Sequence, residues 1–125
     1  MREAQGKGLP KGARVRKTDE FSSVFAFRCR TKGAFFQVFA KPNGGQGPRL
    51  GLVVSRRVER RAVRRNRMKR VLREAFRKAR PTLPSLDWVV RVHTGFVDVD
   101  SDRVAGELMR QFGVLTRKCH AGLSS

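Results

Sequence analysis

Arginine and lysine side chains crowd the 25 residues from Arg56 to Arg80. This stretch holds thirteen cations and two acids, Glu59 and Glu74, so its net charge of +11 is more than half of the chain's +19. Guanidinium groups present planar donors that match phosphate oxygens two at a time, and clustered cations gain affinity for a polyanion by releasing its condensed counterions. These residue types therefore predict the binding of phosphate groups, with a nucleic acid as the leading ligand.

Apolar residues in the second half of the stretch recur at i, i+3, i+4, i+7, i+8 and i+11, which indicates one buried face of an α-helix. They are Met68, Val71, Leu72, Ala75, Phe76 and Ala79. A helical projection places a polar set on the neighbouring arc, namely Asn66, Lys69, Arg70, Arg73 and Arg77. Glu74 is four residues from both Arg70 and Lys78, so i,i+4 ion pairs are expected there. Pro81 should end the helix, because the residue before a proline avoids the helical conformation.

Residues that could catalyse a reaction by themselves are sparse. His93 and His120 have no partner constellation, and the chain has no zinc-protease, serine-hydrolase or phosphate-loop motif. Asp98, Asp100 and Asp102 lack the glycine and the distal glutamate of a calcium loop, so we expect them to cap a helix. We predict neither a catalytic residue nor a metal ligand in this chain.

The composition favours one RNA-binding or DNA-binding domain. The chain has 125 residues, 39% of them apolar, which suits a single modest core, and its pI of about 11.8 indicates nucleic acid or an anionic membrane as partner. No apolar run approaches the ~20 residues that span a bilayer, and no signal-peptide pattern opens the sequence, so we expect a cytoplasmic protein without a membrane partner. Cys29 and Cys119 lack metal-ligand spacing, and we expect two unremarkable thiols rather than a disulfide or a zinc site.

The elements that must position the basic stretch can be read from turn signals and periodicity. The sequence predicts a flexible basic arm over 1–17, a helix over 19–27 capped by Thr18, and a turn or short strand over 30–33. Strands over 34–41 and 49–55 are expected to pair as an antiparallel hairpin. The basic helix follows, then a strand over 88–93, a final helix to about 118 and a flexible tail over 119–125. This order predicts a single α/β (α+β) domain over 18–118, a two-layer sandwich of a small mixed sheet with packed helices.

The motif Arg64–Arg65–Asn66–Arg67–Met68–Lys69–Arg70–Val71–Leu72–Arg73–Glu74–Ala75–Phe76 closely resembles the signature of the bacterial ribonuclease P protein subunit. The first helix, with Asp19–Glu20–Phe21 and Val24–Phe25, and the strand Arg49 to Ser55 with Arg56–Arg57 also resemble that family. The resemblance spans about residues 17–118. It implies the order αβββαβα, a four-stranded mixed sheet and a left-handed βαβ crossover, against the usual right hand.

The resemblance also implies a function. The family's holoenzyme is a ribonucleoprotein endonuclease that removes the 5′ leader from precursor tRNA. Its RNA subunit carries the active site and the magnesium ions, and one accessory protein binds that RNA, contacts the leader and aids magnesium-dependent catalysis. The scarcity of catalytic residues in this chain fits such a division of work.

Site residues are carried over by position. RNA contacts are implied for Arg65, Asn66, Arg67, Lys69, Arg70 and Arg73, and the same basic stretch adds Arg56, Arg57 and Arg77. Phe21, Phe25 and Phe39 match the positions of the family's leader cleft. Stacking platforms beside a cationic rim suit single-stranded RNA, yet the helical spacing of Phe21 and Phe25 suits core packing equally well. Phe35 or Phe36 is expected on the buried face of the same strand as Phe39.

Two other classes of function remain open on the sequence alone. A ribosome-associated or other structural RNA-binding protein without a processing role would use the same charge. A DNA-binding basic helix is the third hypothesis, although no zipper or helix-turn-helix partner is present to place that helix in a groove.

Overall fold

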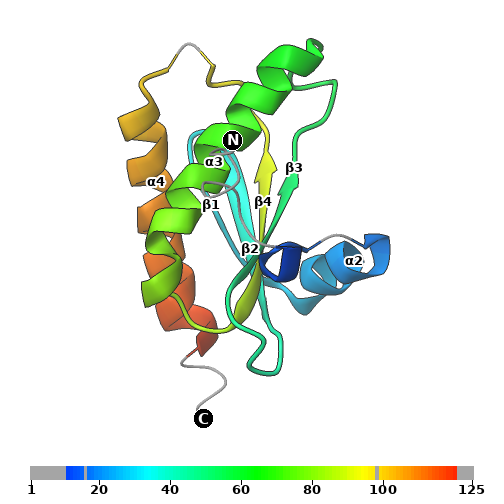
Figure 1. Cartoon of the computed structure of the whole chain (residues 1–125), viewed down its shortest axis with the longest axis vertical. Coiled ribbons are helices and arrows are strands. Elements are labelled where there is room, and N and C mark those ends of the chain that lie inside the picture. The colour runs from blue at the N-terminus through cyan, green and yellow to red at the C-terminus, as the bar shows by residue number, and fades with distance from the viewer. Residues whose placement is uncertain (1–10, 16, 98, 121–125) are drawn as a thin grey trace.

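The elements of the chain follow the order αβββαβα that the family resemblance implies (Figure 1). The structure is a computed structural model that describes residues 11–15, 17–97 and 99–120. The main elements are α2 (Thr18–Phe27), β1 (Cys29–Lys32), β2 (Phe36–Pro42), β3 (Arg49–Val53), α3 (Ala62–Ala79), β4 (Leu86–Val92) and α4 (Ser101–Leu115). The chain also has three short helical segments: η1 (Lys11–Ala13) before α2, η2 (Arg80–Thr82) after α3, and η3 (Thr116–His120) after α4.

The four strands form one mixed sheet in the order β1-β2-β4-β3. β1–β2 and β2–β4 are antiparallel, and β3–β4 is parallel. The predicted hairpin of residues 34–41 with 49–55 is therefore wrong, because β4 lies between β2 and β3. A strand that is apolar on both faces belongs in the middle of a sheet, and six of the seven residues of β4 are buried. The Gly-rich loop after β2 instead crosses the beginning of β4, where Asn43 donates a hydrogen bond to Asp87 Oδ1 at 2.9 Å.

The connection from β3 through α3 to β4 is a left-handed crossover. β3 and β4 point the same way, and Figure 1 shows α3 in front of the sheet with β4 to the left of β3. Seen with the helix in front and the strands pointing up, a right-handed crossover would place the second strand to the right. The hand implied by the family resemblance is thus confirmed.

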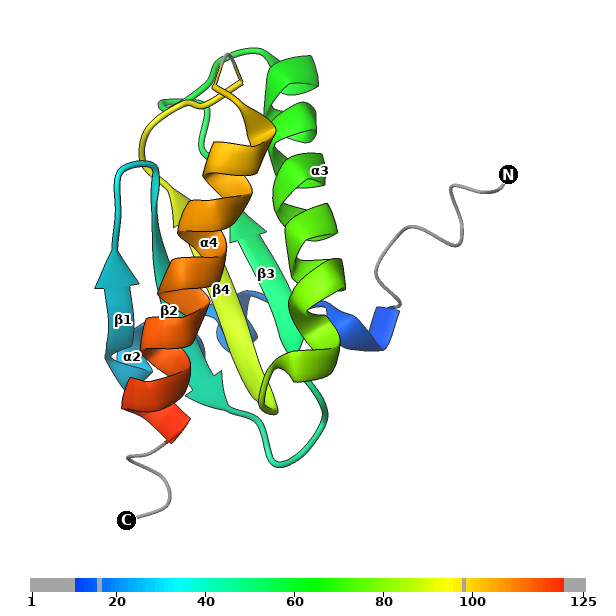
Figure 2. The same cartoon turned by 90° about the vertical axis from the view of Figure 1, so that its left-hand side faces the viewer.

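The main core lies between the sheet and the pair α3 and α4, which cover the same face (Figure 2). Met68, Leu72 and Phe76 of α3 are fully buried there, so the predicted apolar stripe of the basic helix is confirmed. The Phe112 ring of α4 lies 5.8 Å from that of Phe76 and 4.8 Å from that of Trp88 in β4. Burying a large apolar side chain contributes about 1.5–3 kcal/mol, so this stripe fixes which arc of α3 faces outward.

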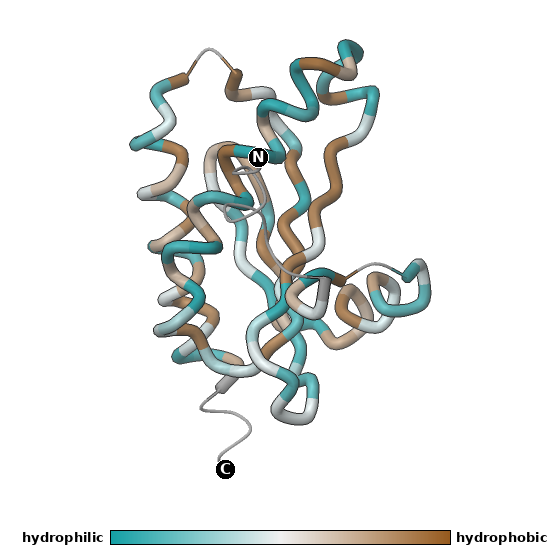
Figure 3. Tube along the Cα trace, in the orientation of Figure 1, coloured by the Kyte–Doolittle hydropathy of each residue, from teal (hydrophilic) through white to brown (hydrophobic). Residues whose placement is uncertain are grey.

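A second, smaller cluster lies on the opposite face of the sheet, where α2 packs. Val24 of α2, Phe39 of β2 and Val89 of β4 are its buried members. Residues alternate between the faces of a strand, so Phe36 enters the main core while Phe39 enters this one. Figure 3 shows the hydrophobic central strands between more hydrophilic helix surfaces.

Helix starts agree only in part with the sequence analysis. Thr18 is the first residue of α2 and not its cap, because the N-cap position falls on Lys17. The Glu20 carboxylate accepts a hydrogen bond from the Lys17 backbone N–H at 3.2 Å, which satisfies a donor at the helix start. The predicted cap of the last helix is confirmed, since the Asp100 side chain accepts from the Asp102 N–H at 3.0 Å.

Two expectations about the ends of the chain need correction. Within the predicted arm, residues 11–15 pack on the sheet: Ala13 and Val15 are buried, and the Val15 N–H donates to Leu50 O at 2.9 Å. Residues 1–10 and 16 of that arm, and 121–125 of the predicted tail, lie outside the described residues. The expectation of two unpaired thiols is also wrong, because Cys29 and Cys119 form a disulfide, with their Cα atoms 6.0 Å apart. Their sequence separation of 90 gave no sign that β1 and η3 are neighbours.

Candidate RNA-binding interface

The outward arc of α3 carries the polar residues that the sequence analysis placed there. Because Met68, Leu72, Ala75 and Phe76 face the core, Asn66, Arg67 and Arg70 are exposed. Lys69 and Arg73 lie at the flank of the helix and are half-buried. Figure 3 shows hydrophilic residues recurring along the outward side of α3. The structure thus brings Asn66, Lys69, Arg70 and Arg73 onto one side of a single rigid element. Arg67, an RNA contact implied by the family resemblance, lies on the other flank of α3, beside Val97 and Ser101.

Arg65 has a local task at the start of α3. Its Nη1 donates to the backbone oxygens of Glu59 and Arg60, each at 2.9 Å. Beside it the Arg64 Nε donates to Glu59 Oε1 at 3.0 Å, and this hydrogen bond lowers the pKa of Glu59 below its ordinary value. These contacts hold the turn that leads into the helix, where the N-cap residue Arg61 makes no capping hydrogen bond with its own side chain. Arg65, a predicted RNA contact, therefore also stabilises the start of α3.

Arg77 is paired within the helix. Its Nε and Nη2 donate to the two carboxylate oxygens of Glu74 at 3.1 and 2.6 Å, and this contact raises the Arg77 pKa. The expected ion pairs at Glu74 were i,i+4, whereas this pair is i,i+3. A carboxylate partner offsets the charge of Arg77 in the free protein, so Arg77 differs from the residues on the outward arc.

Arg56 and Arg57 lie after β3, before α3 begins, and both are exposed. The turn is held by the Val58 N–H, which donates to Ser55 O at 3.1 Å. Residues 57–61 line a wide, open hollow of about 680 Å³. The two arginines therefore extend the basic surface beyond the first turn of α3.

The three phenylalanines of the predicted cleft have different surroundings. Phe39 is only 3% exposed and lies beneath Phe25, whose ring meets it edge-on with centroids 4.8 Å apart. Phe21 and Phe25 are half-buried and pack against the sheet. Phe21 lies close on β3, since a Cβ at Gly51 would be 2.7 Å from its ring. Phe39 is thus a supporting residue, and Phe21 and Phe25 each keep part of their surface free.

Beyond α2, the same face of the sheet carries polar and cationic side chains. Gln37 pairs with Arg91 across β2 and β4, two residues from Phe39 and Val89 on the same face. Arg91 is exposed and its guanidinium carbon lies 6.0 Å from the Phe25 ring centroid. An aromatic surface beside a cation is the arrangement that stacks and holds single-stranded nucleic acid. Sequence analysis missed Arg91, although its alternation with Val89 places the two on one face.

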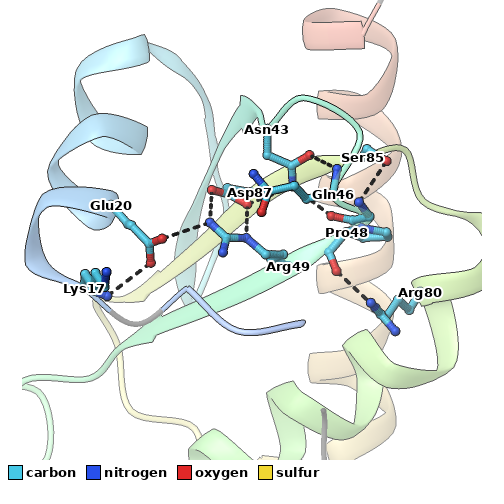
Figure 4. Close-up of polar contacts among 10 residues, drawn as sticks. Lys17, Glu20, Asn43, Gln46, Pro48, Arg49, Arg80, Ser85 and Asp87 are labelled. Atoms are coloured by element: carbon cyan, nitrogen blue, oxygen red, sulfur yellow. Dashed lines mark hydrogen bonds and ion pairs between the residues drawn. The ribbon is translucent and has the colours of Figure 1, made fainter. Parts of the chain in front are cut away.

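Arg49, at the start of β3, fastens α2 to the sheet (Figure 4). Its Nε and Nη2 each donate to Asp87 at 2.7 Å, and Nη2 also approaches Glu20 Oε2 at 3.3 Å. The side chains of Arg49 and Asp87 are 14% and 11% exposed, and their hydrogen bonds raise the Arg49 pKa. This hub of Arg49, Asp87 and Glu20 was missed by sequence analysis, because its members are far apart in the chain.

Neither a metal centre nor a membrane span is found in the described part of the chain. No three His, Cys, Asp or Glu side chains among residues 11–15, 17–97 and 99–120 gather to hold a metal ion. No helix in those ranges is both long and apolar enough to cross a bilayer.

Comparisons with known proteins agree with the family resemblance. The Ribonuclease P family model matches residues 9–116. The ribonuclease P protein component of Chromobacterium violaceum is 48% identical over 90% of this chain and 92% of its own length. That of Methylococcus capsulatus is 40% identical over 97% and 94%.

Solved structures agree as well. The RNase P protein from Thermotoga maritima, solved with 1-(4-fluorophenyl)-2-thiourea, superposes with a TM-score of 0.72 and 31% identity over 83% of this chain and 98% of that one. A Staphylococcus aureus RNase P protein, at 24% identity and a TM-score of 0.77 over 83% and 88%, shares the fold. Since the family model covers residues 9–116 and the two relatives match over more than nine tenths of their own length, the chain belongs to the ribonuclease P protein family.

Proposed function

We propose that this chain is the RNA-binding protein subunit of a ribonuclease P ribonucleoprotein, which removes the 5′ leader of precursor tRNA. The observation that carries the proposal is the outward arc of α3. There the signature of the family coincides with cations that have no carboxylate partner within the described residues. The partner in this proposal is one ribonuclease P RNA per protein.

The RNA subunit binds along α3. Asn66, Arg67 and Arg70 are exposed at its surface, with Lys69 and Arg73 beside them. Arginine forks on a rigid helix suit the phosphates of a folded RNA. Arg56 and Arg57 continue this surface past the helix start. Arg65 and Arg77 contact the RNA either by leaving their partners within the protein, the Glu59 and Arg60 carbonyl oxygens and the Glu74 carboxylate, or by binding RNA and these partners together.

The leader binds on the opposite side of the sheet, over α2. Phe21 and Phe25 offer partly free aromatic surfaces, Phe39 supports Phe25 from below, and Arg91 supplies a cation. Stacking on aromatic side chains tolerates any base, which suits leaders of differing sequence.

Bond cleavage belongs to the RNA subunit in this proposal. Magnesium is held by the RNA in this proposal, as the family resemblance implies. Among residues 11–15, 17–97 and 99–120, no three His, Cys, Asp or Glu side chains gather to hold a metal ion. The protein's part is to reduce electrostatic repulsion between RNA segments and thereby to lower the magnesium concentration that the RNA requires.

Single-turnover cleavage of precursor tRNA by a bacterial ribonuclease P RNA at low magnesium, with and without this chain, tests the proposal. Strong rescue of correct 5′ cleavage is expected. Absence of rescue, with an RNA that another protein subunit does activate, would refute it. Sedimentation with ribosomal subunits and no preference for precursor tRNA would then favour a structural RNA-binding role.

A further inference from the structure

A pocket of about 250 Å³ lies along the outer edge of the sheet, at β3. Three elements and the N-terminal segment meet there. We name it the β3-edge pocket, and it is lined by Arg14, Val15, Phe21, Leu50, Leu52, Lys69 and Arg73. It lies between the basic face of α3 and the aromatic face of α2, so it is the place where those two surfaces meet.

The first wall of the pocket is the segment before α2. Arg14 forms a parallel β-bridge with Leu50, and the next residue, Val15, donates its N–H to Leu50 O at 2.9 Å. Ala13 and Val15 are buried on either side of Arg14, whose own side chain is exposed. The backbone of Arg14 is thus fixed on the edge strand, while its exposed side chain lines the pocket. A local sequence pattern gives no sign of this, since Arg14 stands among many cations.

The opposite wall comes from α3. Lys69 and Arg73 are four residues apart and therefore neighbours on the helix surface. Leu50 and Leu52 of β3 and the Phe21 ring give the pocket apolar surfaces between its two cationic walls. This mixture of cations and apolar groups matches a nucleotide, which has an anionic phosphate and a largely apolar sugar and base face.

The charges in the pocket are uncompensated. Its lining contains three cations and no acid. Within the described residues, the side chains of Arg14, Lys69 and Arg73 form no hydrogen bond and no ion pair. Loss of water around Arg73, together with repulsion from Arg14 and Arg70, lowers the Arg73 pKa from its ordinary value. An anion between the walls would relieve this repulsion, whereas Arg49 and Arg77 each have a carboxylate partner.

We propose that the β3-edge pocket binds one phosphodiester group of RNA between Arg14, Lys69 and Arg73, with its sugar against Leu52 and Phe21. The inference rests on the proposed function and adds Arg14 and a defined subsite to it. RNA held there would pass around the edge of β3, from the α3 surface toward the α2 surface. The phosphodiester comes either from the RNA subunit or from the precursor-tRNA leader.

The test is the salt dependence of RNA binding by Arg14→Gln in the full chain. Arg110→Gln on α4 is the matched control, because it removes the same charge from an exposed side chain outside the pocket. Arg14→Gln should lower the slope of log affinity against log salt by about one and weaken binding about eightfold at 0.1 M salt. Arg110→Gln should leave both unchanged, and Arg14→Lys should restore the slope because it restores the charge.

Two arms identify the source of the phosphate. A loss in binding to ribonuclease P RNA alone assigns it to the RNA subunit. A loss confined to leader-bearing precursor tRNA, absent with leaderless tRNA on the holoenzyme, assigns it to the leader. Lys69→Gln repeats the test from the helix wall, which covers any disturbance of the N-terminal segment by the Arg14 change.

Equal slopes for Arg14→Gln, Lys69→Gln and Arg110→Gln in both arms, with wild-type protein that rescues cleavage, would overturn the pocket and leave the proposed function intact. Failure of the wild-type protein to rescue cleavage would instead count against the proposed function. An effect on duplex DNA equal to that on both RNAs would also overturn the assignment to RNA.

Discussion

Two clusters of charged side chains flank the beginning of β3, and they differ in the partners that they contain. In the hub on the α2 side, Arg49 meets Asp87 and Glu20 within 3.3 Å. In the β3-edge pocket, Arg14, Lys69 and Arg73 meet no acid. A buried carboxylate compensates the charge of its guanidinium, so removing one partner destabilises the fold, whereas cations gathered without a carboxylate repel one another until an anion binds. Net charge therefore says less about function than the distribution of acids among the cations.

The largest effect is expected in the hub. Asp87→Ala leaves the Arg49 guanidinium largely buried with only Glu20 nearby, and such a loss costs about 3 kcal/mol of unfolding free energy. Glu74→Ala, which removes the more exposed partner of Arg77, should cost less than about 1 kcal/mol. Urea unfolding of the two variants measures both values. Similar losses of unfolding free energy in the two variants would mean that the burial of the Arg49–Asp87 pair adds nothing to its contribution.

Leader binding should show the next largest effect. Phe21→Ala with Phe25→Ala removes the two partly free aromatic surfaces, and stacking contributes about 1–3 kcal/mol per base. The holoenzyme should therefore lose at least about tenfold in affinity for leader-bearing precursor tRNA and little for leaderless tRNA. Phe39→Leu, which keeps an apolar side chain beneath Phe25, should preserve the preference for a leader. An equal loss for both tRNAs would reduce Phe21 and Phe25 to packing residues.

Local and distant features of this molecule were predictable to different degrees. The buried stripe of α3, with Met68 and Phe76, was predictable because helical periodicity lies in neighbouring residues. The wrong hairpin came from treating a short loop as a pairing signal, when the apolar residues on both faces of β4 decided the order of strands. Arg14 and the disulfide of Cys29 with Cys119 were not predictable either, since both depend on contacts between distant segments.

Paired and unpaired cations of α3 should also differ in RNA binding. Arg73→Gln should lower the salt slope of ribonuclease P RNA binding by about one, because Arg73 has no competing carboxylate. Arg77→Gln should lower it by clearly less, since Glu74 already offsets that charge. Filter binding at several salt concentrations gives both slopes from one series. A slope that does not change in Arg73→Gln would remove Arg73 from the contacts.

The smallest effect concerns the start of α3, where Arg64 and Glu59 form a pair that is less buried than that of the hub, with side chains 30% and 16% exposed. The hydrogen bond from Arg64 lowers the Glu59 pKa, so the ionised carboxylate stabilises the turn above the ordinary glutamate pKa of about 4.3. A lowered pKa in the folded state means that this contribution is lost as the pH falls through that range. Amide chemical shifts of residues 59–65 should therefore change as the pH falls below the ordinary glutamate pKa of about 4.3.

Glu59→Gln should remove that pH dependence, because it replaces the carboxylate that titrates. Arg64→Gln should move it to higher pH, because the hydrogen bond from Arg64 is the largest cause of the lowered Glu59 pKa. Arg65, whose Nη1 donates to the carbonyl oxygens of Glu59 and Arg60, should hold the turn in both variants. The turn would then persist at low pH with weaker amide protection. Amide shifts that stay constant in the wild-type protein would show that the contacts of Arg65 with the Glu59 and Arg60 carbonyl oxygens alone hold the start of α3. The Arg64–Glu59 pair would then not fix α3 in the way that the hub of Arg49, Asp87 and Glu20 fixes α2.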